Sequence, residues 1–137
     1  MSIEEENKAL VRRFDQFYNQ RDFDACHELL APEFVSHRTS GDVPREEVIQ
    51  GNLMLYHAFP DINLNIDFMV AEGDMVVYWE TWTGTHKGDF MGIPPTGKTV
   101  FMTNATTFRV ANGKFAEAWV VLDAMNLMQQ LGAIPSR

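Results

Sequence analysis

The sequence is poor in cysteine, and this scarcity excludes two kinds of protein at once. Among its 137 residues there is a single cysteine, Cys26, so neither an internal disulfide nor a multi-cysteine metal site can form. Cys26 falls in an apolar helical pattern with Ala25, Leu29 and Leu30. This pattern predicts a core position rather than a reactive thiol.

Basic charge and long apolar runs are also scarce. Eleven Lys and Arg residues against 19 Asp and Glu give a formal net charge of −8, which would be repelled by a phosphate backbone or an anionic membrane. No apolar run approaches the roughly 18 residues of a membrane span. The opening MSIEEENKAL lacks the basic and apolar segments of a signal peptide. We therefore expect a cytoplasmic protein with no nucleic-acid and no membrane partner.

The remaining composition is that of an ordinary globular protein. Hydrophobic residues make up 45% and charged residues 22% of the chain. The length fits one domain over residues 1–137 that can bury a core without staples.

Helical spacing dominates the first half of the chain. Apolar residues recur on one face between about residues 3 and 20, and Asp22 can cap a second short helix that Pro32 ends. A third helix is predicted from about Pro44 to Phe59. The stretch EFVSHRTSGDVP between them predicts a short extended piece and then a loop.

Alternating and β-branched residues dominate the second half. They predict a four-stranded antiparallel meander from residue 62 to 122, with hairpin turns at 72–74 and 111–113. A short closing helix covers 124–131, with Gly132 just past its end. Helices followed by a meander indicate an α+β fold in which the helices cover one face of a curved sheet.

This order of elements, with the segments ELLAPEFVSH, GDFMGIPPTGK, NGKFAEAW and LMQQLG, resembles the SnoaL-like polyketide cyclases of the nuclear transport factor two-like superfamily. The likeness covers nearly the whole chain, and the loop at 92–97 is its most specific part. The resemblance implies a cone in which three N-terminal helices pack on a curved antiparallel sheet around one pocket. Members include cofactor-free cyclases, isomerases and hydrolases, and also proteins with no known activity.

The chain departs from the family at the residues that carry the cyclase chemistry. The family's cyclases typically place a histidine and an acid on the last strand, two residues apart. The matching positions here are Ala118 and Val120, and a second histidine found in some cyclases falls at Thr106. None of the three can serve as the general acid or base, so that mechanism cannot be transferred.

Two other residues are candidates for proton transfer. If the family's inward-facing set holds on the strand MVVYWETWTGTH, Glu80 points into the pocket, where desolvation would raise its pKa and suit acid/base work. A β-bulge would reverse this, leaving Glu80 in solvent beside a lysine or arginine. His37 is the second candidate because the family often has a pocket histidine there, although it could equally be satisfied at the loop entrance.

The same alternation, together with the apolar faces of the first and third predicted helices, predicts the walls of the pocket, in which Tyr78, Asn104 and Thr106 would orient ligand oxygens. The predicted binding residues are Phe14, Phe17, Tyr56, Tyr78, Trp82, Met102, Asn104, Thr106, Phe108, Ala118, Val120 and Leu122. The histidines lack the spacing of metal ligands, so no metal is expected, and the resemblance implies no cofactor. Asp123 fits a helix cap better than a catalytic acid, because its alternation places it away from Val120.

These features leave three functions open. The first is a cofactor-free enzyme acting on an apolar or aromatic, oxygen-bearing substrate. The second is a non-catalytic module that binds a small ligand in the same pocket, and the third is a dimeric interaction protein with a vestigial pocket. A homodimer is expected through the outer sheet face, whose apolar residues are too many to leave exposed. They are Val77, Trp79, Thr81, Trp119 and Val121.

Overall fold

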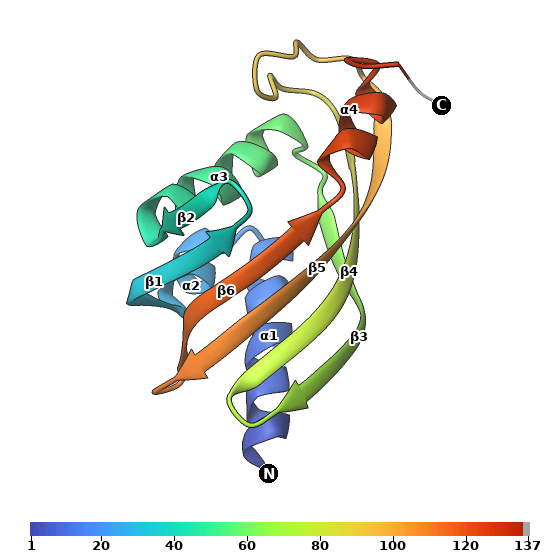
Figure 1. Ribbon diagram of the computed structural model, residues 1–137. Helices are drawn as coiled ribbons and strands as arrows, with labels where there is room; N and C mark the ends of the chain where they lie inside the picture. Colours follow the sequence, from blue (N-terminus) through green and yellow to red (C-terminus); the bar gives the residue numbers. More distant parts are fainter. Residues whose placement is uncertain (136–137) are drawn as a thin grey trace.

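In the computed structural model, which describes residues 1–135, four helices accompany one six-stranded sheet (Figure 1). Three precede or interrupt the early strands: α1 (Ile3–Asn19), α2 (Phe23–Glu28) and α3 (Arg45–Ala58). The fourth, α4 (Ala124–Leu131), follows the last strand. Among the described residues, no helix is long and apolar enough to cross a membrane.

The sheet is curved and mostly antiparallel. Its strands are β1 (Leu30–Arg38), β2 (Gly41–Pro44), β3 (Asn63–Glu72), β4 (Met75–Thr85), β5 (Thr99–Ala111) and β6 (Lys114–Leu122). They lie in the order β2-β1-β6-β5-β4-β3, and β1 runs parallel to β6 while every other neighbouring pair is antiparallel. This α+β arrangement is the predicted cone-shaped fold.

The core forms where α1 meets the inner face of the sheet. Val11, Phe14 and Tyr18 recur at helical spacing and are buried. The Phe14 ring packs edge-on against Phe108 of β5 at 5.8 Å and Phe115 of β6 at 5.5 Å between ring centroids. The apolar stripe of one helix therefore fixes α1 across the meander, which decides which α1 side chains face the sheet.

The sheet extends further than the sequence predicted. The four-stranded meander is present as β3 to β6, but the segment expected to be a short piece and a loop forms the hairpin of β1 and β2, which adds to the free edge of β6. The ladder between β1 and β6 shifts register between Leu30 and Val35, a stretch that contains Pro32. Proline has no amide hydrogen to donate, so the pairing of β1 is interrupted near Pro32 although the strand still forms.

A second departure lies in β3. The alternation of Ile62, Leu64, Ile66 and Phe68 predicts that all four share one face, but Phe68 is 59% exposed. The register with β4 shifts between Ile66 and Phe68, as in a β-bulge, and turns the following residues over so that Met69 packs on the core.

The loop from Lys87 to Lys98 folds back over the end of the sheet and is held by His86. The histidine, expected from sequence at a solvated rim, is fully buried, and its Nδ1 accepts the Thr96 backbone N–H at 3.2 Å. The Gly97 N–H donates to the His86 carbonyl at 2.9 Å. These bonds bring Phe90 and Met91 to the inner side of the sheet.

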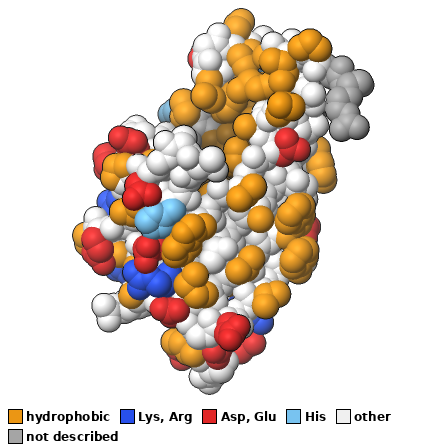
Figure 2. Space-filling model, in the orientation of Figure 1, with side chains coloured by type: hydrophobic (Ala, Val, Ile, Leu, Met, Phe, Trp, Pro, Cys, Tyr) orange, Lys and Arg blue, Asp and Glu red, His pale blue; other side chains and the backbone are white. Residues whose placement is uncertain are grey.

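The outer face of the sheet is turned away from α1, and Figure 2 shows hydrophobic side chains spread along its strands. Trp79 is 39% exposed, Trp119 38% and Val121 73%. Val77, Phe68 and Phe101 are exposed on neighbouring strands. A face this apolar is typical of an interface rather than of a surface left in water.

We therefore expect a two-fold pairing of this face with a second copy of the chain. Trp119→Glu should shift the protein to monomer, because it places a charge within the apolar face. Ile3→Glu, which alters an exposed apolar residue on the helical side, is the control and should leave the assembly unchanged. Light scattering at micromolar concentration is the measurement, and a monomeric wild-type protein would contradict the expectation.

Candidate active site

A cavity of about 290 Å³ lies between the inner face of the sheet, α1 and α3. The loop residues Phe90 and Met91, together with Leu127 of α4, close one side. Ten of the predicted wall residues line it, namely Phe14, Tyr78, Trp82, Met102, Asn104, Thr106, Phe108, Ala118, Val120 and Leu122. Most of the lining is apolar or aromatic, as in sites that hold a small organic ligand.

The register of the sheet arranges the inward-facing residues in rows. Tyr78 of β4 lies opposite Thr106 of β5, which lies opposite Val120 of β6. In the next row, Glu80 lies opposite Asn104. Val120 leaves this inward position on β6 apolar, and the sheet carboxylate that lines the cavity is Glu80, two strands away on β4.

Glu80 points into the cavity, as predicted if the strand keeps the family's inward-facing set of residues. Its neighbours Tyr78 and Trp82 on the same face are also buried, while Trp79 faces outward. Glu80 is 5% exposed, and Asn104 donates from Nδ2 to its Oε2 at 3.4 Å. Within residues 1–135, the other carboxylate oxygen of Glu80, Oε1, has no hydrogen-bond partner.

A second carboxyl group, not predicted from the sequence, stands beside Glu80. Asp15 of α1 is 5% exposed and lines the same cavity, and the charge of Glu80 contributes to the rise of its pKa. Two ionised carboxylates repel each other and have no donor between them, so their proximity favours a proton on one of the two. The site therefore contains a paired acid.

The environment raises the pKa of both acids, but not equally. Burial, then the charge of Glu80 and the hydrogen bond to it, hold the pKa of Asp15 well above its usual range. Burial also raises the pKa of Glu80, while hydrogen bonds from Asp15 and Asn104 work against that rise. We infer that Asp15 keeps the proton and Glu80 carries the charge, which places an acid and a base side by side.

The sequence does contain a signal for Asp15. It lies four residues after Val11, next to Phe14 and three before Tyr18, and so falls on the apolar face of α1. An acid on the buried face of an amphipathic helix has to be paired or neutral. This spacing alone does not say which strand residue it meets.

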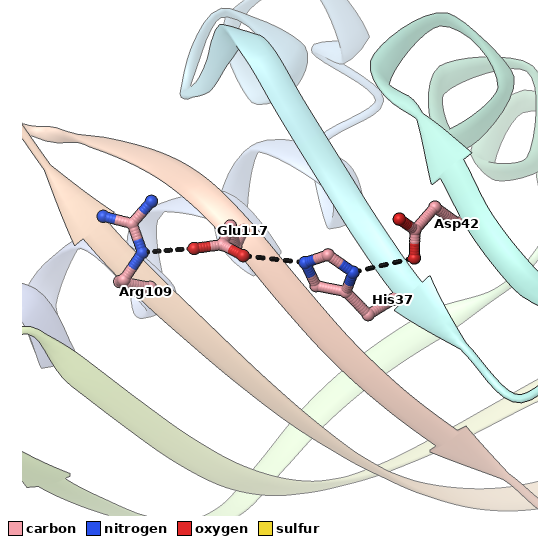
Figure 3. A network of polar contacts seen from close by, with 4 residues as sticks. All are labelled: His37, Asp42, Arg109 and Glu117. Atoms are coloured by element: carbon pink, nitrogen blue, oxygen red, sulfur yellow. Dashed lines mark hydrogen bonds and ion pairs between the residues drawn. The ribbon is translucent and has the colours of Figure 1, made fainter.

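His37 is not in the cavity, which corrects the sequence-based assignment. On β1 the buried Ser36 faces inward, so its neighbour His37 faces outward. Its Nδ1 lies 2.8 Å from Asp42 Oδ1 and its Nε2 lies 2.7 Å from Glu117 Oε2 (Figure 3). Glu117 also accepts from Arg109 Nε at 2.5 Å. The histidine therefore belongs to a charged network on the outer face.

Phe17 and Tyr56, the other two predicted wall residues, also lie outside the cavity lining. Phe17 is half-buried and packs against the core. The Tyr56 ring contacts Phe23 of α2, with 4.9 Å between centroids, and the Arg21 guanidinium lies 5.2 Å from it. Both residues were predicted from helix spacing, which identifies an apolar face but not the part of that face that borders a space.

Asp123 caps α4 as predicted. Its Oδ1 accepts the Asn126 backbone N–H at 3.1 Å, and Gly132 ends the helix with a left-handed φ of 79°. Its carboxylate does not line the cavity. Among the described residues, no group of three or more His, Cys, Asp or Glu side chains could hold a metal ion.

Comparison with known proteins agrees with this architecture. A model of the SnoaL-like polyketide cyclase family matches residues 8–131. AclR from Streptomyces galilaeus, a proposed hydroxylase, is 30% identical with a TM-score of 0.92, over 98% of this chain and 85% of its own. A proposed SnoaL-like polyketide cyclase from Jannaschia sp. CCS1 is 28% identical with a TM-score of 0.87, over 98% and 97% of the two chains.

IdmH from Streptomyces antibioticus, a proposed polyketide cyclase, is 29% identical with a TM-score of 0.81, over 92% of this chain and 98% of its own. No curated protein matches the chain. The fold and site define an α+β protein with a largely apolar cavity that two buried acids line. The chain belongs to the SnoaL-like polyketide cyclase family.

The paired acid makes a prediction about stability. A buried acid with a raised pKa is stabilised in its protonated form, so its cost to folding grows as the pH rises through the folded-state pKa. Asp15→Asn removes that cost and keeps the shape. The variant should match the wild type in mildly acidic solution and unfold at a higher temperature than it in alkaline solution. Thermal melts across this range test this, and an alkaline destabilisation by Asp15→Asn would contradict it.

The charged network on the outer face predicts a stabilisation that is lost in alkaline solution. Hydrogen bonds to Asp42 and Glu117 raise the pKa of His37, so its contribution to stability is complete below the ordinary histidine pKa and is lost as the pH rises through the raised one. His37, then Arg109, lower the pKa of Glu117, whose contribution is lost on acidification. His37→Gln should therefore lower the melting temperature near pH 6 and change it little near pH 9. A loss of equal size at both pH values would contradict this assignment.

Proposed function

We propose that this protein is a cofactor-free enzyme that moves a proton on an apolar or aromatic, oxygen-bearing substrate held in the cavity. The reaction would be of the cyclase, isomerase or hydrolase type. The observation that carries the proposal is the pair of acids Asp15 and Glu80, both 5% exposed and both lining a cavity whose walls are largely apolar. Perturbed carboxyl pairs in such places are typical of general acid/base sites.

The two acids have different parts in this proposal. Glu80, the member that carries the charge, accepts a proton from a carbon beside a substrate carbonyl. Asp15, the member that keeps its proton, supplies the acid that balances the charge gained by the substrate oxygen. Returning the proton to a different atom is an isomerisation, whereas attack of the resulting carbanion on a second carbonyl is a cyclisation. Tyr78 and Thr106, which lie opposite each other on β4 and β5, would orient the oxygens.

The location of the pair also supports the proposal. The cyclases of this family act through an acid on the last strand, and Val120 stands there in this chain. Glu80 and Asp15 supply ionisable groups to the same enclosed space from β4 and α1. Cyclase and hydroxylase names among the similar structures suggest reactions at oxygen-bearing rings, which the aromatic walls would accommodate.

The rival function is a binding module that uses the same cavity without turnover. Ala118 and Val120 favour it, because they leave the β6 side of the cavity apolar and dry. A vestigial pocket in a dimeric interaction protein is the third alternative. Ligand-dependent thermal stabilisation without reaction would support the binding module, and the absence of any ligand effect would support the third.

Proton transfer can be measured without knowledge of the natural substrate. The probe is 2-tetralone, a flat bicyclic ketone whose protons beside the carbonyl exchange with deuterated water. We expect the protein to accelerate this exchange, measured by proton NMR. Glu80→Gln should reduce the acceleration by about 10²–10⁴-fold, the usual share of general acid/base catalysis.

Asp123→Asn is the matched control. It changes an acid to an amide at the helix cap, where asparagine serves about as well as aspartate, and should leave the exchange rate nearly intact. Wild-type exchange no faster than in buffer would argue against proton transfer on ketones. Loss of exchange in Asp123→Asn with retention in Glu80→Gln would show that Asp123, and not Glu80, transfers the proton, and would contradict the proposal.

A further inference from the structure

The negative charge of the acid pair has no cation to balance it inside the cavity. Within residues 1–135, neither Asp15 nor Glu80 forms a salt bridge; the pairs that do form involve other residues. Arg38 is the one lysine or arginine among the described residues that line the cavity. It is exposed, and its Nε donates to Ser36 Oγ at 3.3 Å. Glu47, also exposed in the lining, adds a further negative charge.

A proton on one of the two acids relieves the repulsion between the carboxyl groups. The pair still carries one negative charge once its other proton is lost. The one side-chain donor to that charge outside the pair is Asn104, at a long 3.4 Å, among the residues the structure describes. A buried charge without a strong partner is costly, and the cost falls when a cation arrives.

The walls next to the pair are suited to a cation. Tyr78 and Trp82 stand two residues on either side of Glu80 on the same face of β4, and both are buried. Phe14 precedes Asp15 on α1 and also lines the cavity. The faces of aromatic rings attract cations, and more strongly when water is excluded. The carboxylates and the neighbouring aromatic side chains therefore favour a cation in the same cavity.

We propose that the cavity is a binding site for a flat ring system that carries a protonated nitrogen, and that it rejects anions of the same shape. The nitrogen places an N–H on Glu80 and lies among the neighbouring rings. A cavity of about 290 Å³ stands at the small end of ligand pockets, so a bicyclic ring system is the size expected. This is a statement about binding, and it holds whether or not the protein turns over a ketone.

Three ligands of one shape test the proposal: 2-aminotetralin, which is a cation at neutral pH, the neutral 2-tetralone and the anion of tetralin-2-carboxylic acid. Titration calorimetry at neutral pH and moderate salt should show that the amine binds at least about 10-fold more tightly than the ketone. The carboxylate should show no binding up to millimolar concentration. Equal affinity of amine and ketone, or binding of none of the three, overturns the proposal.

Matched variants separate the acid pair from the general negative charge of the protein. Asp15→Asn with Glu80→Gln neutralises the pair without changing its shape, and it should bring the affinity for the amine down to that for the ketone. Glu80→Gln alone serves the same purpose if the double variant does not fold. Glu46→Gln removes an exposed charge from α3 outside the cavity lining and should keep the preference. Persistence of the preference in the pair variants, or its loss in Glu46→Gln alone, also overturns the proposal.

The outcome can be separated from that of the proposed function. Preference for the amine without acceleration of ketone exchange would support this inference and contradict proton transfer. Acceleration of exchange without any preference for the amine would support proton transfer and contradict this inference.

Discussion

Two buried carboxyl groups from distant parts of the chain, Asp15 and Glu80, stand together at a largely apolar cavity, and the account of this protein depends on their proximity. It exists because the apolar stripe of α1 packs across the meander, which sets Asp15 against the inward-facing Glu80. Neither acid could be stable there alone as an ion, since burial disfavours its charge. A protonated Asp15 can donate to an ionised Glu80, so the pair places a donor and an acceptor in one cavity.

The contact also shows that an acid can reach the cavity from more than one element of this scaffold. Every second residue of β4, β5 and β6 faces the same cavity, so an acid can serve the space from several positions. Here Val120 makes the β6 position apolar, and the polar groups lie instead on β4, β5 and α1. The fold supplies the enclosure, while the particular inward positions decide the chemistry.

Most of the fold could be predicted from local pattern, and the site only in part. Helical spacing and strict alternation gave the helices and the meander, and alternation placed Glu80 inward. Asp15 was missed because spacing reports the buried face of a helix but not the strand it meets. His37 was assigned to the pocket from the resemblance, but β1 turns it to the outer face, where it contacts Glu117. The exposed Phe68 departs from the alternation of β3 because the register with β4 shifts just before it. Pairing across the fold and bulges are tertiary facts that a single sequence does not encode locally.

The most direct test of the shared proton is a carbon-13 NMR titration of the side-chain carboxyl carbons of Asp15 and Glu80, assigned through Asp15→Asn and Glu80→Gln. The account predicts that the two signals titrate together in two separated steps, the later one well above the range of an ordinary aspartate, because burial and the negative partner oppose the second ionisation. Each single variant should then collapse the behaviour to one step. Two independent titrations at ordinary carboxyl pKa values would contradict the account and remove the basis for acid/base chemistry in this cavity.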